Sequence, residues 1–375
     1  MTIKLSPADK QKLPALLDQL AGAVEELLLS GLTTASEATR QTLNVAFSEA
    51  SRMGLLRLGG TLRAANEELT RFTKNQSEFS ASRLSFFLNR SWLLSQALAK
   101  ALREGNDNDF DRLMRTPGNE PVDQLEVITI GVAQKLVKNT FCSFEFRLRA
   151  VNASGNLPAG QKLMWSCVFP LKPGADLPAE AYLHIPQKQK FAASVFLEKK
   201  VIVIQKAAVT LDASGSGRIS LGELSTVTQG AEFSQWEQFQ NWDCAVALER
   251  IRTHRPGPFD LEIEMQEEVV LRDWAIGEAP ERENEHAPFV FPIVHKNIQL
   301  EAAVSSGAEG AKLLSEMHEL RKTAASKRKP LFGLMHYEKC RMKFQPLSVF
   351  NDDGPKQLML TGEKFNKAVL LRTLF

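Results

Sequence analysis

The hydrophobic residues of this chain change their spacing once, at the segment 117–121. Before that segment, apolar residues recur every three or four positions, which is the spacing of one face of a helix; after it, they alternate with polar residues, as in half-buried strands. The segment itself reads Pro-Gly-Asn-Glu-Pro, and proline and glycine commonly mark turns and loops. We therefore expect an α+β protein, with an antiparallel helical bundle over residues 1–116 and a β-rich, mostly antiparallel domain with a few helices over residues 122–375.

The clearest helical signal in the expected bundle is an apolar seam in its third segment. The seam residues alternate three and four positions apart: Leu55, Leu58, Leu62, Ala65, Leu69 and Phe72. Such a seam packs against neighbouring helices at a shallow angle. We interpret it as the core of one bundle, and the interface of a homo-oligomer is the alternative. Farther upstream, Pro14 is expected to kink or restart the first helix, because proline removes a backbone hydrogen bond. Two N-caps are also expected: Ser6 for the first helix, and Asp243 for a helix over residues 243–253.

Beyond the bundle, the sequence predicts a linker and then a succession of strands. The polar stretch 106–121 is expected to be a solvated linker with a short helical turn through Phe110 and Leu113. Phe259–Gln266 has the cleanest strand alternation of the chain, and residues 289–300 are expected to form one further strand. The β-rich domain could further divide into two sub-domains, and the expected boundary is the charged, proline-containing loop at 278–287.

Residues 212–223 fit the spacing of a twelve-residue EF-hand calcium loop. Asp212, Ser214, Ser216 and Glu223 stand at oxygen-ligand positions, but Arg218 places a positive charge inside the loop. An EF-hand loop also needs a helix on each side, whereas both flanks here are rich in β-branched residues, which favour strands. The sequence therefore favours the turn of a β-hairpin with no bound metal.

A second candidate site is the basic cluster that follows a predicted helix at 310–324. It contains Arg321, Lys322, Lys327, Arg328 and Lys329. Such a cluster can hold phosphates. Cations at a helix C-terminus are also favoured by the exposed carbonyl groups, and the aromatic residues nearby are too few to indicate base stacking. Nucleic-acid binding through these residues is therefore an alternative, and not the preferred function.

Composition indicates a globular protein of the cytoplasm. The 375 residues are 43% hydrophobic and 24% charged, and the net charge of +2 gives no reason to expect a nucleic acid or an anionic membrane as partner. No apolar run approaches the roughly 20 residues that span a bilayer, and the start of the chain does not resemble a signal peptide. The four cysteines are far apart, which is typical of reduced thiols in a cytosolic protein.

The motifs of catalysis and cofactor binding do not occur in the sequence. There is no nucleophile elbow, no phosphate-binding glycine loop and no zinc-protease pair of histidines. We therefore expect a protein without cofactors that binds a protein partner inside an assembly, and a homo-oligomer is left open. An enzyme whose site is assembled from distant residues is the second alternative, because such a site leaves no local motif.

Overall fold

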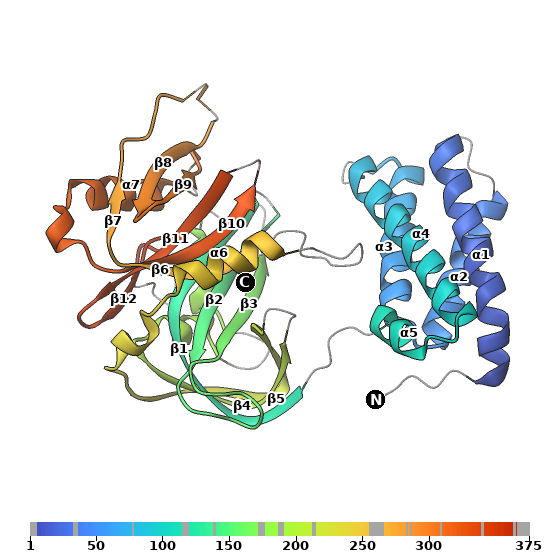
Figure 1. The fold of residues 1–375 in the computed structure, drawn as a ribbon, viewed down its shortest axis with the longest axis horizontal. Coiled ribbons are helices and arrows are strands. Elements are labelled where there is room, and N and C mark those ends of the chain that lie inside the picture. The colour runs from blue at the N-terminus through green and yellow to red at the C-terminus, as the bar shows by residue number, and fades with distance from the viewer. Residues whose placement is uncertain are drawn as a thin grey trace. The chain divides into compact units, whose positions relative to one another are not determined.

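The computed structural model describes residues 6–32, 37–76, 79–114, 120–137, 140–171, 177–186, 191–211, 215–254, 266–282, 284–285, 287–307, 310–338, 341–362 and 365. The chain divides into two compact units, one in the first 118 residues and one formed mainly by residues 119–254 and 264–375. The first unit is helical, and the second combines two curved sheets with a few helices (Figure 1). The expected α+β class, with helices before strands, is confirmed.

Five helices of the described chain surround the core of the helical unit. Their bounds are α1 Pro7–Ser30, α2 Glu37–Arg52, α3 Leu56–Thr73, α4 Ala81–Arg103 and α5 Asp107–Met114. Ser6 is the N-cap of α1, because the backbone N–H of Asp9 donates a hydrogen bond to its hydroxyl at 3.1 Å. The predicted seam lies inside the unit, since its members from Leu55 to Leu69 are buried and Leu62 has no exposed surface.

The structure corrects two expectations for the helical unit in part. The helix does not restart at Pro14, which lies inside α1 between the fully buried Leu13 and Leu17. Their burial, at about 2 kcal/mol each, outweighs the roughly 3 kcal/mol that a proline costs inside a helix. The expected helical turn through Phe110 and Leu113 is present as helix α5, but it is not solvated, because both residues are buried in the core of the bundle.

The first sheet of the β-rich unit is a closed barrel of five strands. They are β1 Glu120–Val137, β2 Phe141–Ala150, β3 Lys162–Pro170, β4 Lys200–Leu211 and β5 Gly217–Glu232. Their order is β1-β2-β3-β5-β4, with β4 returning to pair with β1, and only β3 and β5 run parallel. This is the strand order of an OB-fold. Short helices η1 Ala179–His184 and η2 Ala193–Leu197 connect β3 to β4, and stacked aromatic rings such as Trp165 and Phe196 fill the core.

The second sheet repeats this strand order. Its strands are β6 Glu267–Leu271, β7 Trp274–Ile276, β8 Phe289–His295, β9 Ile298–Val304, β10 Leu331–Glu338, β11 Arg341–Asn351 and β12 Gly354–Gln357. Only Arg272 and Asp273 separate β6 from β7, which stand at the two ends of the order β6-β10-β11-β9-β8-β7. Together they act as one bent strand that pairs with β8 and β10, and β9 and β11 form the parallel pair. We call this sheet the second barrel.

Four short elements complete the β-rich unit. Helix η3 Trp236–Phe239 and helix α6 Cys244–Thr253 connect the first barrel to the second, and helices α7 Ala311–Lys322 and η5 Ala325–Lys327 connect β9 to β10. Asp243 is the N-cap of α6, as the sequence predicts, because its carboxylate accepts hydrogen bonds from the backbone N–H groups of Ala245 and Val246.

An apolar layer joins the two barrels. Ile128 and Ile130 of β1 are fully buried against Phe332 of the second barrel. Between these strands the backbones approach closely, since a Cβ added to Gly131 would lie 2.5 Å from the Phe332 ring. A larger residue at that position would push the barrels apart.

The chain returns from the second barrel to the first after β12. Leu358 is buried in the core of the second barrel, and Leu360 in the core of the first. Glu180 of η1 then accepts three hydrogen bonds, from the backbone N–H groups of Thr361 and Gly362 at 2.7 and 2.9 Å and from the Thr361 hydroxyl at 2.6 Å. We call residues 358–362 the strap.

The structure corrects two expectations for the strands. Residues 289–300 form the hairpin of β8 and β9, which turns at Lys296 with a φ of 52°, and no glycine or proline marks this turn. The loop 278–287 connects β7 to β8 inside the second barrel, and the change of sheet lies between β5 and β6. The alternation at Phe259–Gln266 falls outside the described residues, apart from Gln266 itself.

Candidate binding cleft between the two barrels

A cleft of about 480 Å³ lies where β2 and β3 of the first barrel meet β6 and helix α6. We call it the interbarrel cleft. Its size falls within the range of small-molecule sites in proteins, roughly 300–1,000 Å³. The lining residues with the most distinctive chemistry are Arg149, Lys162, Phe239, Trp242, Arg250 and Glu267.

The first barrel contributes its cations through simple strand alternation. Phe146 and Leu148 of β2 point into the barrel core, so Arg147 and Arg149 point outward. Arg149 stands directly opposite Lys162 of β3. The second barrel covers this part of the sheet, and Arg147 and Arg149 are consequently only 9% and 6% exposed.

Two consecutive carboxylates of β6 hold these cations. Glu267 lies 2.9 Å from Lys162 and 2.5 Å from Arg250 of α6. Glu268 lies 2.5 Å from Arg149. Both carboxylates are buried, and buried charges are stable only when they are paired. The ion pairs therefore clamp the sheet of the first barrel to β6.

Two donors at the cleft remain unpaired. The indole Nε1 of Trp242 and the Nε of Arg250 are shielded from solvent and have no hydrogen-bond partner among the residues that the structure describes. Leaving a buried donor unpaired costs about 1–3 kcal/mol. A water or a ligand oxygen that reached them after a small side-chain rotation would recover part of this loss. The cleft therefore has surplus capacity to donate hydrogen bonds.

The basic cluster predicted from the sequence is held by partners within the second barrel. Three of its members form ion pairs at 2.8, 2.7 and 2.6 Å: Arg321 with Glu278, Lys322 with Glu319, and Lys329 with Asp352. These pairs are largely exposed, so each is worth little in stability. They do lower the positive charge that a phosphate would meet.

Arg328 has a structural role in the same segment. Its guanidinium donates to the carbonyl oxygens of Thr323 and Trp274 at 3.1 and 3.0 Å and stacks over the Trp274 ring at 5.2 Å. Lys327 is exposed and has no partner in the described part of the chain. The cluster therefore contains one cation that is free for a ligand, where the sequence suggested five.

Strands flank the EF-hand-like motif. β4 and β5 pair as an antiparallel hairpin, with Thr210 opposite Arg218, so the strands predicted on either side of the motif are confirmed. Asp212 and Ser214 lie outside the described residues, and Ser216 precedes β5. Glu223 lies in a four-residue bulge of β5 opposite Lys206. Within the described ranges, no group of three or more His, Cys, Asp or Glu residues is placed to hold a metal ion.

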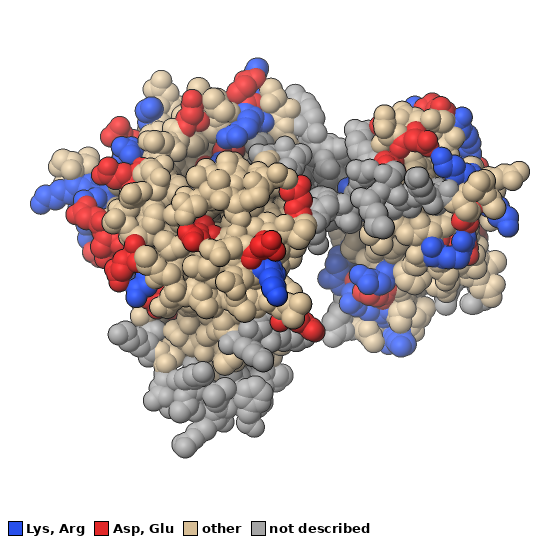
Figure 2. All heavy atoms as spheres, turned by 90° about the horizontal axis from the view of Figure 1, so that it is seen from below, with Lys and Arg blue, Asp and Glu red and all other residues tan. Residues whose placement is uncertain are grey.

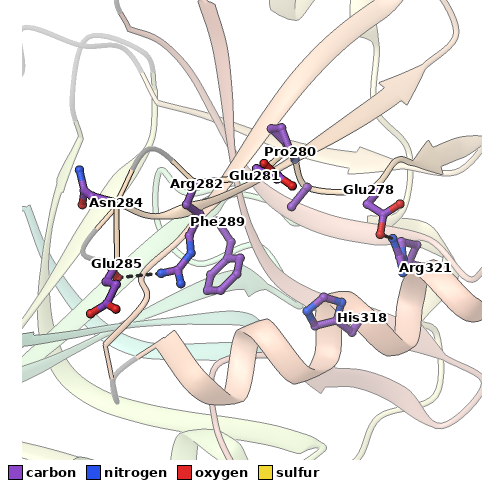
Figure 3. Close-up of a pocket in the computed structure, with 10 residues that line it drawn as sticks. Glu278, Pro280, Glu281, Arg282, Asn284, Glu285, Phe289, His318 and Arg321 are labelled. Atoms are coloured by element: carbon purple, nitrogen blue, oxygen red, sulfur yellow. Dashed lines mark hydrogen bonds and ion pairs between the residues drawn. The ribbon is translucent and has the colours of Figure 1, made fainter.

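A second, more open hollow of about 520 Å³ lies between helix α7 and the loop that precedes β8 (Figure 3). Its two arginines are held by neighbours. Arg321 pairs with Glu278, and Arg282 donates to the backbone oxygen of Glu285 at 2.7 Å and covers the ring of Phe289 at 4.3 Å. Among the described residues that line this hollow, no buried donor lacks a partner, so it does not share the feature that marks the interbarrel cleft.

Sequence reasoning missed the interbarrel cleft. The alternation of Arg147 and Arg149 was visible as the polar face of a strand, but their partner Glu268 lies more than a hundred residues later. Glu267 and Glu268 precede the apolar run of β6, and that pair was the one available signal of buried carboxylates. Trp242 and Arg250 have no local motif, since only the packing of α6 brings them to the cleft.

No model of a known protein family matches the chain, and no curated protein matches its sequence. No described helix is both long enough and apolar enough to cross a bilayer.

Several solved structures are similar over most of their own length. One described as "Structure of murine DNA binding protein bound with ds DNA" covers 65% of this chain and 100% of its own, with 11% identity and a TM-score of 0.28. "Crystal structure of the tetrameric p202 HIN2" covers 62% and 93%, with 9% identity and a TM-score of 0.26. "Structural mimicry for functional antagonism" covers 61% and 92%, with 10% identity and a TM-score of 0.28. Similarity at this level carries no information on function.

Proposed function

We propose that this protein works by binding, inside a cytoplasmic assembly, and that the interbarrel cleft is its ligand site. The observation that carries the proposal is the pair of unpaired donors, Trp242 Nε1 and Arg250 Nε, at a cleft with aromatic walls. Most lining residues of this cleft are polar or charged, and Phe239, Trp242, Val246 and Val270 supply its apolar walls. Ligand sites generally combine such apolar walls with placed polar groups.

The thiols and charges of the described residues support binding over catalysis. Burial raises the pKa of the Cys142 thiol to about 11 and that of the Cys167 thiol to about 12. Both are therefore protonated at neutral pH, and a protonated thiol is a poor nucleophile. Glu267 and Glu268 of the cleft are each fixed by a cation, which suits them to positioning and not to proton transfer.

The surface also disfavours a partner that binds mainly through an extended phosphate backbone. On the face shown in Figure 2, Lys and Arg of the β-rich unit are scattered among acidic residues and a broad area of uncharged ones. The basic cluster at 321–329 is mostly paired internally. Nucleic-acid binding through that cluster is thus a weaker proposal than binding in the cleft.

A substitution that fills the cleft without removing an existing contact tests this function. Val246 of α6 lines the cleft and is 51% exposed, and Val294 of β8 is 41% exposed and lies elsewhere. We expect Val246→Arg to lose the partners that the wild-type protein retains in a pull-down from its host, and Val294→Arg to keep them. Both protein and nucleic acid in the eluates should be identified. Equal retention by the two variants would exclude the cleft as the ligand site.

A further inference from the structure

We propose that the ligand of the interbarrel cleft is a nucleotide unit of a single-stranded nucleic acid. This inference rests on the proposed function, because it names the chemical class of ligand for the same site. Four features of the cleft, namely its place on the barrel, its aromatic walls, its donors and its charge balance, lead to it.

The cleft lies on the β2–β3 surface of the first barrel. In OB-folds, the face of strands 2 and 3 is the one that binds oligonucleotides and oligosaccharides. This is an analogy at the level of the fold and gives only a starting point. Here β6 covers part of that face, and Arg149 and Lys162, opposite each other on β2 and β3, lie at the border that remains open to the cleft.

Two aromatic side chains line the cleft in fixed positions. Phe239 is 9% exposed, and its ring stacks on that of Phe233 with centroids 5.9 Å apart. Trp242 packs on His295 with centroids 5.6 Å apart. Aromatic walls that other rings hold in place suit a planar ligand, and every nucleobase offers such a plane regardless of sequence. A sugar has no aromatic ring and would stack on these side chains less well.

The donors match the acceptors of a nucleotide. Trp242 Nε1 and Arg250 Nε can donate only, so they select oxygen or bare ring nitrogen. Gln238 and Asn241 line the same cleft and are exposed. Amide groups both donate and accept, and they recognise base edges in single strands whose bases are unstacked.

The charge of the cleft limits how much phosphate it can bind. Three lining cations, Arg149, Lys162 and Arg250, face three lining carboxylates, Asp243, Glu267 and Glu268. A balanced set of charges cannot compensate a long phosphate backbone. Binding should therefore rest on stacking and hydrogen bonds, with about one phosphate contact, and a single phosphate on single strands gives a salt slope of only about −0.7. The same balance disfavours a duplex, whose bases are also stacked out of reach.

Fluorescence anisotropy with the full-length protein and labelled eight-nucleotide DNA and RNA tests the inference. We expect Trp242→Ala to weaken binding roughly 5- to 150-fold, the range found when one stacking residue is lost. Trp242→Phe keeps a stacking ring but loses the Nε1 donor, so it should bind more weakly than wild type and more tightly than Trp242→Ala. Arg250→Ala should weaken binding, while Arg252→Ala on the same helix, paired with Glu249 outside the cleft, should not. Thermal unfolding of each variant separates weakened binding from misfolding.

Three results would overturn the inference. The first is that neither oligonucleotide binds measurably. The second is that Trp242→Ala binds the oligonucleotides as tightly as wild type does, or that a duplex binds the wild-type protein as tightly as the single strand does. The third is that a free mononucleotide displaces the labelled strand as effectively as the unlabelled strand does at the same concentration of nucleotide, which would make the ligand a soluble nucleotide. If none of the oligonucleotides binds but Val246→Arg still loses a host protein, the proposed function stands and only the ligand class is wrong.

Discussion

Arg149 of the first barrel and Glu268 of the second form an ion pair at 2.5 Å in which both side chains are less than a tenth exposed. Removing one partner of a buried pair leaves the other charge uncompensated, which typically costs about 3–5 kcal/mol. We therefore expect Glu268→Ala to lower the free energy of unfolding of the β-rich unit by that amount in urea titrations at pH 7. The double variant Arg149→Met with Glu268→Met should recover much of the loss. A double variant as unstable as Glu268→Ala would contradict this explanation.

The pair of Glu301 and Lys343 closes the second barrel and should make its stability depend on pH. The two residues are opposite each other where β9 meets β11, and their charged atoms lie 2.6 Å apart. The Lys343 ammonium, followed by Arg341, holds the pKa of Glu301 below its ordinary value of 4.5. A lowered carboxyl pKa in the folded state means that the ionised form stabilises the fold.

The contribution of Glu301 is therefore fully present above about pH 4.5 and is lost as the pH falls through its lowered pKa. We expect Glu301→Gln to be less stable than wild type at pH 7 and to approach it at the acid end, measured as urea midpoints across the pH range. Glu319→Gln, in an exposed pair with Lys322, is the control and should change little at any pH. A deficit of Glu301→Gln that stays constant with pH would show that charge is not the cause.

The seam of α3 gives a test that separates core from interface. Leu62 is fully buried, so Leu62→Ala should cost roughly 2–5 kcal/mol by leaving a cavity. Leu62→Lys should unfold the bundle, since the ammonium would be buried without a partner. The neighbouring Arg63 is exposed, and Arg63→Ala should have little effect. Light scattering distinguishes the two cases. If the wild-type protein is an oligomer and Leu62→Lys is a folded monomer, the seam is an interface.

The division of the chain near residue 118 remains a prediction that limited proteolysis can test. Because α5 packs its Phe110 and Met114 into the bundle, cleavage should be confined to residues 115–121 and spare residues 107–114. Two resistant fragments are expected. One resistant fragment that spans this region would show that the helical and β-rich parts do not fold separately.

Calcium should have no effect on this protein. The motif at 212–223 follows β4 and runs into β5, whereas a calcium loop of this kind is built between helices. We expect neither heat of binding in calorimetry nor a shift in thermal unfolding on addition of calcium. Binding in the wild type that disappears in Asp212→Ala with Glu223→Ala would establish a metal site.

Local chemistry allowed much of the fold to be predicted from the sequence. The N-caps Ser6 and Asp243 and the seam around Leu62 depend on residues a few positions apart, and all three predictions are confirmed. The turn at Lys296 was not predictable, because a lysine there adopts a conformation that glycine or asparagine usually marks. The helical turn through Phe110 and Leu113 was predicted but its burial was not, because so few apolar residues have no visible partner until the bundle is in place.

The candidate site was less predictable than the fold for a related reason. Strand alternation shows that Arg147 and Arg149 face away from the core of their own barrel, and that is all that local spacing can show. Whether that face meets solvent or another sheet depends on pairing between distant segments. The cleft exists only because β6 and α6 are packed against β2 and β3, so its residues have no common local pattern.

The strap of residues 358–362 has a consequence for how the protein is made on the ribosome. Leu360 belongs to the core of the first barrel, and Glu180 is satisfied by Thr361 and Gly362. During synthesis, all five strands of that barrel emerge well over a hundred residues before the strap does. Until then, Leu360's place in the core is open and the Glu180 carboxylate lacks these partners. The core of the first barrel can therefore be completed only after the second barrel has been translated.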